Sequence, residues 1–305
     1  MRNKALVLFN PSAGMGRALR DRETLEGLLR DSGFAHEFVV TASEAHLRDF
    51  ARRAARSGRT IVGAGGDSTF HLIVNEIMAA GGKAALGLLG LGSSNDITLE
   101  FGLETPGRAV AALQAGRTKK IDLGVIAQER RVVRYFLGQA NIGLGAAVND
   151  YVARLARRRP RLARRQTLAG ILGILDAYRK RRIPVPLEVL SDRETIDGSF
   201  AAAVFSNTRY WATGKMIAPR ARPDDGRLDA CLIEQCPFPR LVRINALASK
   251  GRHERAREVR LLQAREFTVS SAAPLAVQAD GELLPALRPG PVQFQVATRV
   301  LRLIC

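Results

Sequence analysis

Several features that define other protein classes are scarce or missing in this chain of 305 residues. Its three cysteines, Cys231, Cys236 and Cys305, form neither an even disulfide framework nor a metal-spaced set. They fit reduced thiols in a cytoplasmic protein. No apolar run reaches the roughly 18 residues that a membrane-spanning helix needs. The N-terminal stretch reads as a first strand and not as a signal peptide. We therefore expect a cytoplasmic protein.

Two signatures of nucleotide and nucleic-acid binding are also absent. No G-x-x-x-x-G-K-[ST] motif occurs, which excludes a Walker A phosphate loop. The basic residues have no interleaved aromatic platform and no zinc-ligand spacing beside them, so we expect no nucleic-acid partner. Any phosphate site must therefore be built in another way.

Acidic residues are the scarcer charge, 29 against 47 lysines and arginines, which gives a net charge of +18. The basic residues cluster at 154–165 and 179–182, with more around 252–260. Such clusters attract anionic surfaces such as acidic lipid. The alternative is a solvated surface on a protein that is rich in arginine throughout. Apolar residues flank the first cluster and would suit an interfacial amphipathic helix: Tyr151, Val152, Leu155 and Leu162.

The most informative segment is 60–76, which reads TIVGAGGDSTFHLIVNE. A β-branched run breaks into glycines and small polar residues, and apolar residues then recur at helical spacing. This pattern predicts a strand, a glycine-rich turn and the start of a helix. Free N–H groups and the helix dipole would favour a phosphate there. The alternative is an ordinary strand-to-helix turn capped by Asp67 or Ser68.

Two further segments follow the same design. The strand-like run Ala5–Phe9 leads into 10–17 (NPSAGMGR), and Ala85–Leu89 leads into 90–96 (GLGSSND). The carboxyl ends of parallel strands share one edge of a sheet, and ligands of open α/β sheets bind at that edge. The three turns together predict a nucleotide site.

The order of predicted elements changes near residue 120. Before it, strands and helices alternate, which favours a parallel sheet covered on both faces. After it, strands dominate, with turn signals such as Asp197-Gly198 and Asp280-Gly281, and a few helices interrupt them. We expect a Rossmann-like α/β domain over 1–120 and an antiparallel β-sandwich with inserted helices over 121–305.

Seven short blocks, in order, resemble the catalytic domain family of diacylglycerol kinases, which includes soluble bacterial lipid kinases and sphingosine kinases. Ser68 stands where this family has the third glycine of G-G-D-G-T, and Ser93-Ser94 replaces Thr-Gly in the next block. Serine at 68 is unstrained if its φ is negative and strained if its φ is positive. The blocks are Asn10-Pro11-Ser12-Ala13-Gly14, Gly65-Gly66-Asp67-Ser68-Thr69, Asn75-Glu76, Gly92-Ser93-Ser94-Asn95-Asp96, Asp122-Leu123-Gly124, Asp225-Gly226-Arg227-Leu228-Asp229 and Asp280-Gly281-Glu282.

The resemblance implies the same two-domain architecture, with ATP and Mg²⁺ meeting the acceptor between the domains. It implies Glu282 as general base, with Asp280 as an orienting or metal-linked partner. Asp67 is the strongest Mg²⁺ candidate, whereas Asp96 is equally a helix cap and Asp122 equally a structural acceptor. The implied ATP residues are Asn10, Pro11, Ser12, Ala13, Gly14, Thr41, Gly65, Gly66, Asp67, Ser68, Thr69, Phe70, His71 and Ser93, and the implied structural Mg²⁺ residues are Arg222, Asp225 and Arg227.

Arg17 follows the first glycine turn, where its guanidinium could reach a phosphate or simply face solvent. Three functions fit these residues: a lipid kinase, an NAD kinase and a nucleotide- or lipid-binding protein with little turnover. The Asn95-Asp96 loop and the Asp280-Gly281-Glu282 block favour the lipid kinase. The same resemblance favours an anionic membrane as the partner of the basic clusters, with peripheral association. Whether the chain forms a homodimer is left open.

Overall fold

The computed structural model describes residues 4–305, apart from the side chain of Gln166. The first domain contains a parallel sheet in the order β4-β3-β1-β2. Strands β1 and β3 are buried along their whole length, as expected for central parallel strands covered on both faces. The strands are β1 (Ala5–Phe9), β2 (His36–Val40), β3 (Ile61–Gly65) and β4 (Ala85–Gly90).

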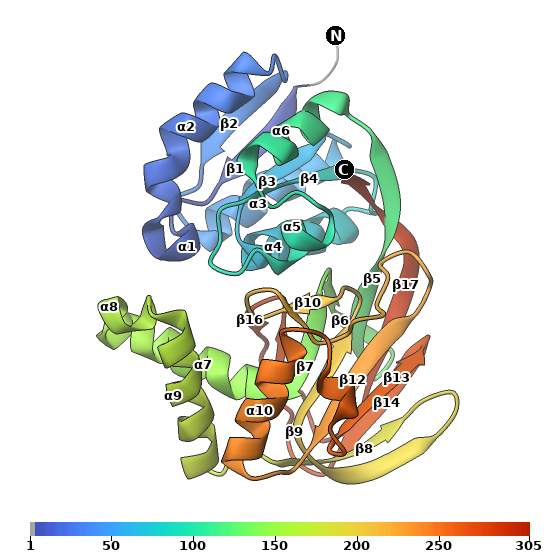
Figure 1. Ribbon diagram of the computed structural model, residues 1–305. Helices are drawn as coiled ribbons and strands as arrows, with labels where there is room; N and C mark the ends of the chain where they lie inside the picture. The colour runs from blue at the N-terminus through green and yellow to red at the C-terminus, as the bar shows by residue number, and fades with distance from the viewer. Residues whose placement is uncertain (1–3) are drawn as a thin grey trace.

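Helices cover this sheet, and their ends follow the sequence closely. The Ser43 hydroxyl accepts a hydrogen bond from the His46 N–H at the start of α3, and Thr105 caps α6 in the same way. In Figure 1, α1, α4 and α5 lie at the rim of the first domain that faces the second. The helices are α1 (Ala13–Gly16), α2 (Ala18–Asp31), α3 (Glu44–Arg56), α4 (Asp67–Ala79), α5 (Asp96–Glu100) and α6 (Pro106–Ala115).

The second domain is an antiparallel β-sandwich with inserted helices. The rings of Phe205 and Phe294 stack in its core with centroids 4.1 Å apart. Its elements are β5 (Thr118–Gln128), β6 (Arg131–Phe136), β7 (Gln139–Gly143), α7 (Leu144–Arg158), α8 (Pro160–Ala163), α9 (Gln166–Arg179), β8 (Val185–Leu190), β9 (Thr195–Ser206), β10 (Tyr210–Trp211), β11 (Lys215–Met216), β12 (Leu228–Glu234), α10 (Phe238–Ala248), a 3₁₀ turn (His253–Arg255), β13 (Val259–Ala264), β14 (Glu266–Ser271), β15 (Val277–Ala279), β16 (Glu282–Leu283) and β17 (Gly290–Ile304).

Strand β17 belongs to both domains. It pairs antiparallel with β14 in the sandwich and with β5 along most of its length. Its last residues then run parallel to β4, where Arg302 lies opposite Ala85. The side chains of Leu301, Leu303 and Ile304 pack in the core of the first domain. The two domains are therefore joined by a continuous sheet as well as by the chain.

The predicted fold class is confirmed: a parallel-sheet domain is followed by an antiparallel β-sandwich. The division at residue 120 stays a prediction. The turn predicted at Asp197-Gly198 is wrong, because both residues pair with β8 inside β9. The chain reverses at Ser191–Glu194 instead, where the Ser191 N–H donates to the Glu194 carbonyl. Ser68 lies within α4 and is not among the residues with positive φ, so it causes no backbone strain.

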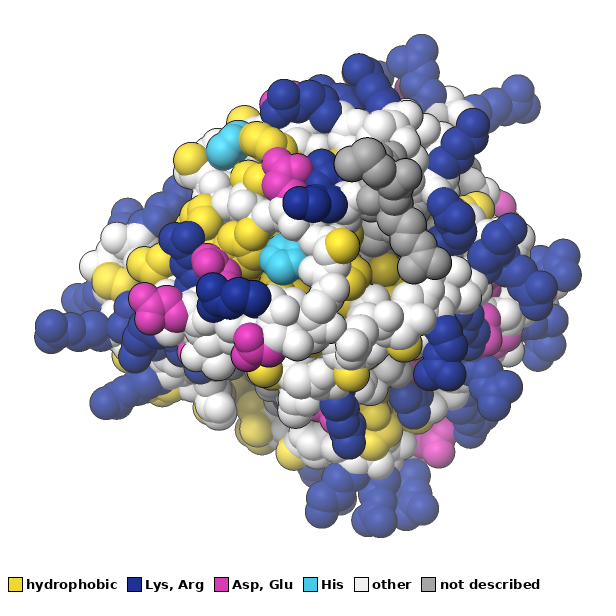
Figure 2. Space-filling view, turned by 90° about the horizontal axis from the view of Figure 1, so that it is seen from above, with side chains coloured by type: hydrophobic (Ala, Val, Ile, Leu, Met, Phe, Trp, Pro, Cys, Tyr) yellow, Lys and Arg dark blue, Asp and Glu magenta, His cyan; other side chains and the backbone are white. Residues whose placement is uncertain are grey.

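None of the helices in residues 4–305 combines the length and the apolar character that crossing a bilayer requires. The first domain, seen from above in Figure 2, carries lysine and arginine side chains around its whole outline. On this face the positive charge is spread widely and forms no single patch.

Candidate active site at the domain junction

The three glycine turns pack against one another through their backbones. The Leu91 N–H donates to the Gly65 carbonyl at 2.7 Å. A Cβ added to Gly92 would lie 2.6 Å from the Gly66 Cα, and one added to Gly14 would lie 2.8 Å from the Leu91 carbonyl oxygen. Only residues without side chains allow this approach, and Gly14 also has a φ of +60°. The turns after β1, β3 and β4 therefore form one continuous backbone surface.

Side chains of the predicted ATP set hold these turns in place. The Asn10 amide donates to the Thr69 hydroxyl at 3.0 Å, and its oxygen accepts from the Ser12 N–H at 3.0 Å. The Thr41 hydroxyl donates to the Phe9 carbonyl at 2.9 Å. The Arg17 guanidinium donates to the Gly14 carbonyl at 3.2 Å. Of the other predicted residues, Pro11, Ala13, Gly65, Gly66 and Ser93 lie on or next to these turns, whereas Asp67, Ser68, Phe70 and His71 lie at the start of α4, with Phe70 buried in the core of the first domain.

Asp67 and Asp96 lie next to each other where the second and third turns meet. The Asp67 carboxylate accepts hydrogen bonds from the N–H groups of Asp96 and Ile97, both at 3.2 Å, and so caps α5. Burial, with the Asp96 charge as the next cause, raises the pKa of Asp67 to about 7. When both are ionised, the carboxylates of Asp67 and Asp96 repel each other.

Asp96 also reaches the second domain. Its carboxylate accepts hydrogen bonds from the N–H groups of Thr213 and Gly214, at 3.2 and 2.6 Å, in the segment between β10 and β11. Burial raises the pKa of Asp96, while these N–H groups and the Lys215 charge act in the opposite direction. Asp96 therefore links the third glycine turn to the sandwich.

Asp280 lies in a tight turn between β15 and β16, as its sequence predicts, with φ values of +45° at Asp280 and +93° at Gly281. Its carboxylate is buried and accepts hydrogen bonds from three successive N–H groups, those of Leu137, Gly138 and Gln139, at 2.7–3.0 Å. The His71 Nδ1 lies 3.1 Å from the same carboxylate. These contacts make Asp280 the residue that fixes the turn against the start of β7 and against α4.

Glu282 follows this turn, on β16, with its side chain partly exposed. In the described part of the chain, no group donates a hydrogen bond to its carboxylate and no cation forms an ion pair with it. The neighbouring Gly281 faces α4, since a Cβ there would lie 3.9 Å from the Ser68 Cβ. The Asn149 amide donates to the Gly281 carbonyl at 2.5 Å. The turn thus holds Glu282 beside the second glycine turn.

The structure places Asp122 away from Asp67 and Asp96. The Asp122 carboxylate is fully buried and accepts from the Gly226 and Arg299 N–H groups, both at 2.7 Å. The Asp225 carboxylate accepts from the Arg227 N–H at 3.0 Å on the turn that Asp122 supports, which also contains Arg222. Within residues 4–305, no three His, Cys, Asp or Glu side chains form a metal cluster. A Mg²⁺ ion needs fewer, because water and phosphate supply its other ligands.

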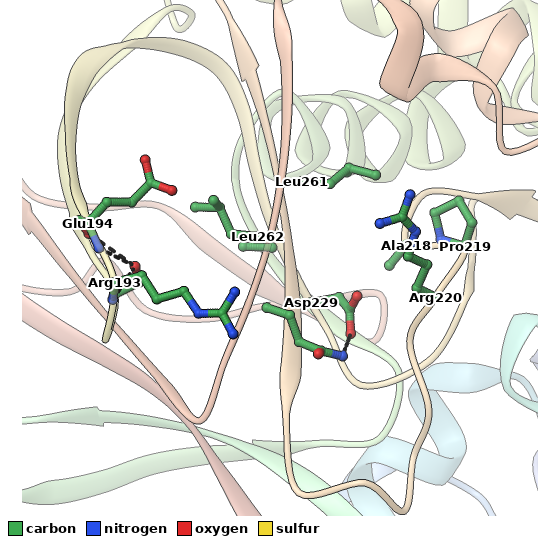
Figure 3. Close-up of a pocket in the computed structure, with 11 residues that line it drawn as sticks. Arg193, Glu194, Ala218, Pro219, Arg220, Asp229, Leu261 and Leu262 are labelled. Atoms are coloured by element: carbon green, nitrogen blue, oxygen red, sulfur yellow. Dashed lines mark hydrogen bonds between the residues drawn. The ribbon is translucent and has the colours of Figure 1, made fainter.

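A separate hollow of about 360 Å³ lies on the sandwich. Figure 3 shows Arg193 and Glu194 on one side of it, Ala218–Arg220 on the other and Asp229 below. Burial raises the pKa of Asp229 to about 6. None of the predicted site residues lines this hollow, so it does not belong to the junction site.

Both domains match the models of known families. Residues 4–126 match the model of the diacylglycerol kinase catalytic domain, and residues 138–305 match that of the YegS C-terminal NAD kinase beta sandwich-like domain. A diacylglycerol kinase of Mycobacterium tuberculosis is 30% identical over 302 residues, which cover 98% of this chain and 95% of the relative. The chain therefore belongs to the diacylglycerol kinase catalytic domain family.

Other comparisons agree over nearly the whole length. A diacylglycerol kinase of Staphylococcus aureus is 26% identical over 297 residues, covering 92% of this chain and 87% of the relative. A crystal structure from Bacillus anthracis, named a diacylglycerol kinase, covers 99% of this chain and 96% of its own, with a TM-score of 0.71 and 15% identity. At that identity the structural match shows the shared fold alone.

One contact of the junction was not predicted from the sequence: the Asn149 amide donates to the Gly281 carbonyl. Asn75 belongs to the Asn75-Glu76 block, but no role was assigned to it; in the structure its side chain holds α4 against β6. A polar residue within an apolar stretch is the only sequence signal at Asn149. That signal does not say which partner the side chain finds in the folded protein.

Proposed function

We propose that this protein is an ATP- and Mg²⁺-dependent lipid kinase that transfers the γ-phosphate to the hydroxyl of diacylglycerol or a related lipid. The observation that carries the proposal is the position of the Asp280-Gly281 turn, which leads into Glu282, against the start of α4: a Cβ on Gly281 would lie 3.9 Å from the Ser68 Cβ, next to the glycine turn that precedes this helix. Such turns bind phosphate, and a nearby carboxylate can accept the proton of the attacking alcohol. Residues 1–120 would then form the nucleotide domain and 121–305 the lipid domain.

The residues divide the work of phosphoryl transfer between the domains. N–H groups of the turns at Gly14, Gly66 and Gly92 would orient the phosphates. Asp67 and Asp96 would hold Mg²⁺, which relieves their repulsion and, when bound, neutralises phosphate charge. Glu282 would take the proton of the lipid hydroxyl. Asp280 would orient the turn, since its carboxylate is fully engaged by N–H donors.

A labelled-phosphate assay tests this proposal. Purified protein is given [γ-³²P]ATP and Mg²⁺ with diacylglycerol, other lipid alcohols or NAD. We expect label in diacylglycerol or a related lipid, and at least about 100-fold slower transfer in Glu282→Ala with ATP affinity largely kept. Glu266→Ala, which removes an exposed carboxylate on β14, is the matched control.

Each alternative gives a different outcome in the same assay. Label in NAD alone would make the protein an NAD kinase. ATP binding without transfer to any acceptor would make it a binding protein. Unchanged transfer in Glu282→Ala would exclude that residue as the base.

We also propose that the helical arm formed by α7, α8 and α9 docks on an anionic membrane. In Figure 1 the arm projects from the second domain, and α7 begins beside the Gly281 turn. Leu168, Ile171 and Leu175 are 38–43% exposed and recur at helical spacing on α9. The arginines on the neighbouring turns are exposed as well: Arg157, Arg158, Arg159, Arg161, Arg164 and Arg165.

This arm differs in detail from the amphipathic helix expected over the first basic cluster. The helix breaks at Arg159 and Pro160, and the exposed apolar residues lie on α9. Co-sedimentation with phosphatidylglycerol vesicles would test the proposal. We expect binding that weakens with salt and weakens further in Ile171→Ser, whereas Val132→Ser, an exposed apolar residue on β6, leaves it unchanged. Binding that ignores salt would contradict electrostatic docking. A cytoplasmic location stays a prediction.

A further inference from the structure

Residues 209–216, which include β10 and β11, form a hairpin at the junction between the two domains, here termed the strap. In Figure 1 its strand β10 lies at the rim of the second domain, below α5. The N–H groups of Thr213 and Gly214 in the strap donate to the Asp96 carboxylate, at 3.2 and 2.6 Å. Asp96 is the first residue of α5 and follows the third glycine turn directly. The strap therefore holds this turn from the side of the second domain.

A second carboxylate of α5 binds the start of the strap. Glu100 accepts from the Arg209 N–H at 2.9 Å, and its Oε1 lies 3.1 Å from the Arg209 Nε in an ion pair. The Glu100 side chain is buried and the Arg209 side chain is partly exposed. Between these two carboxylates the helix packs on the strap, since a Cβ on Gly214 would lie 3.6 Å from the Leu99 Cδ2. Both ends of α5 thus hold the strap.

The turn of the strap has a strained backbone. Ala212, Thr213 and Gly214 follow one another with φ values of +47°, +72° and +81°. Glycine adopts such values freely, whereas a β-branched threonine at this φ is an outlier. A backbone of this kind persists only where its surroundings hold it, and it is typical of functional segments. Here it is held by the bonds to Asp96 and by the Lys215 ammonium, which donates to the Ala212 carbonyl at 2.6 Å.

The contacts that hold the strained turn depend on the negative charge of Asp96. The N–H groups of Thr213 and Gly214 point their positive ends at its carboxylate, and the Lys215 charge attracts it as well. A divalent cation on this carboxylate would offset its charge and repel the same groups, because the ion is then the largest local charge. The bonds to the strap would weaken, and the strained turn would relax.

We propose that the strap is a switch at the active site: it is closed while its N–H groups hold the Asp96 carboxylate, and it opens when Asp96 binds Mg²⁺. This inference deepens the proposed function and rests on Asp96 as a Mg²⁺ ligand. Opening frees the third glycine turn from the second domain. Binding of the metal and access to the junction are thereby coupled.

The fluorescence of Trp211 tests this proposal, because Trp211 lies in the strap and is the single tryptophan of the chain. Its ring is partly buried against the hydrophobic cluster of the second domain. We expect its emission to shift to longer wavelength as MgCl₂ is added, alone or with a non-hydrolysable ATP analogue. Asp96→Asn should not respond, because it lacks the charge that binds the cation. The proposal is overturned by a wild-type spectrum that stays unchanged up to about 10 mM MgCl₂ in both titrations, or by an equal response in Asp96→Asn.

Relief of the strain separates a switch from a passive contact. Thr213→Gly keeps the N–H donor and favours the closed strap, so the Mg²⁺ concentration at the midpoint of the shift should rise about threefold to tenfold. Arg209→Gln loses the ion pair with Glu100 and should lower the midpoint about twofold. Arg130→Gly is the matched control, since Arg130 has a φ of +62° in the turn between β5 and β6, and its midpoint should equal that of the wild type.

Thermal melting checks that each variant is folded, and Thr213→Gly with Arg209→Gln carries the test if Asp96→Asn is not. An unchanged midpoint in Thr213→Gly, or an equal rise in Arg130→Gly, would contradict the role of the strained turn and overturn the switch.

Failure of the switch can be told apart from failure of the proposed function, because the fluorescence needs no lipid acceptor. If Trp211 responds to Mg²⁺ as expected but no lipid is phosphorylated, the switch stands and the lipid kinase is wrong. If lipid is phosphorylated and the Trp211 emission never changes, only the switch is wrong.

Discussion

The second domain contains two Asp-Gly turns, and the same dipeptide has a different role in each. Gly281 and Gly226 both have positive φ, +93° and +72°. At the first turn, Asp280 is 3% exposed and accepts from three N–H groups with His71 beside it. At the second, Asp225 is exposed and accepts from a single N–H, that of Arg227, with the Gln263 amide 3.4 Å away.

The difference shows that the surroundings, and not the dipeptide, decide what such a turn does. Asp280 connects three parts of the molecule, namely β16, the start of β7 and α4. Asp225 holds its own turn and accepts from one side chain beyond it, the Gln263 amide. Removing a carboxylate that accepts from several buried N–H groups lowers stability strongly, because each of these donors is then left buried without a hydrogen-bond partner.

Removing the two carboxylates gives the largest expected contrast. Asp280→Ala leaves three buried N–H groups unpaired and should lower the free energy of unfolding by about 3–5 kcal/mol. Asp225→Ala loses two exposed hydrogen bonds, from the Arg227 N–H and the Gln263 amide, and should lower the free energy of unfolding by less than about 1 kcal/mol. Denaturant unfolding followed by circular dichroism measures both. Equal losses would show that burial does not distinguish the turns.

Asp67 extends the contrast to the pH dependence of stability. Its folded pKa of about 7 lies above the ordinary value of 3.8, chiefly because of burial. Between these values the unfolded state has released a proton that the folded state keeps, so stability falls as pH rises from 4 to 7 and is level above 7. The fall should be roughly 2–4 kcal/mol. In Asp67→Asn the fall should become smaller by about this amount, and the part that is left comes from other buried carboxylates such as Asp229.

Unfolding in urea without Mg²⁺, repeated at several pH values, measures how the free energy of unfolding depends on pH. Asp197→Asn is the control, since Asp197 is exposed on β9 and should change this pH dependence little. A wild-type curve that is level from pH 4 to 7 would contradict the raised pKa.

Adding a methyl group to each turn sharpens the comparison at a smaller scale. Gly281→Ala and Gly226→Ala both place a Cβ at positive φ and should each lower the free energy of unfolding by about 1–2 kcal/mol. Only Gly281→Ala should also slow phosphoryl transfer, because it shifts the turn that carries Glu282. Calorimetry and the labelled-phosphate assay measure the two effects. Equal loss of activity in both variants would count against a special role for the first turn.

Ser68 gives the smallest expected effect. It is in α4 with ordinary helical φ, and its Cβ faces Gly281 without crowding it. Ser68→Gly should lower the free energy of unfolding by roughly 0.5 kcal/mol and leave the phosphorylation rate within about twofold. A large loss of activity would mean that the hydroxyl contacts a substrate.

The sequence predicted the fold well where its elements are regular. The strand Ala5–Phe9 has the predicted bounds, and β4 extends the predicted run Ala85–Leu89 by one residue, because apolar runs and the glycine turns that end them agree there. The short strands β15 and β16 were not predicted, since two or three residues give no period. Asp197-Gly198 looked like a turn, but pairing with β8 outweighed the local preference.

The sequence predicted the individual segments of the candidate site but not all of the contacts between them. The glycine turns meet at one sheet edge, as expected for parallel strands. Asp122 lies beside the Asp225 turn, where it accepts from the Gly226 N–H. It also accepts from the Arg299 N–H on β17, which is 177 positions away in the chain, so the sequence does not reveal this position. Asn149 gave no signal because its contact with the Gly281 carbonyl exists only once α7 and the Asp280-Gly281 turn are folded.

The course of β17 has a consequence for synthesis on the ribosome. The first sheet needs Leu301, Leu303 and Ile304 to complete its core, although all its other strands are made within the first 90 residues. Domains usually fold in the order in which they emerge. Here the nascent first domain must wait, with the apolar edge of β4 uncovered, until the whole sandwich has been translated. A chaperone that binds nascent apolar strands would find its site on β4.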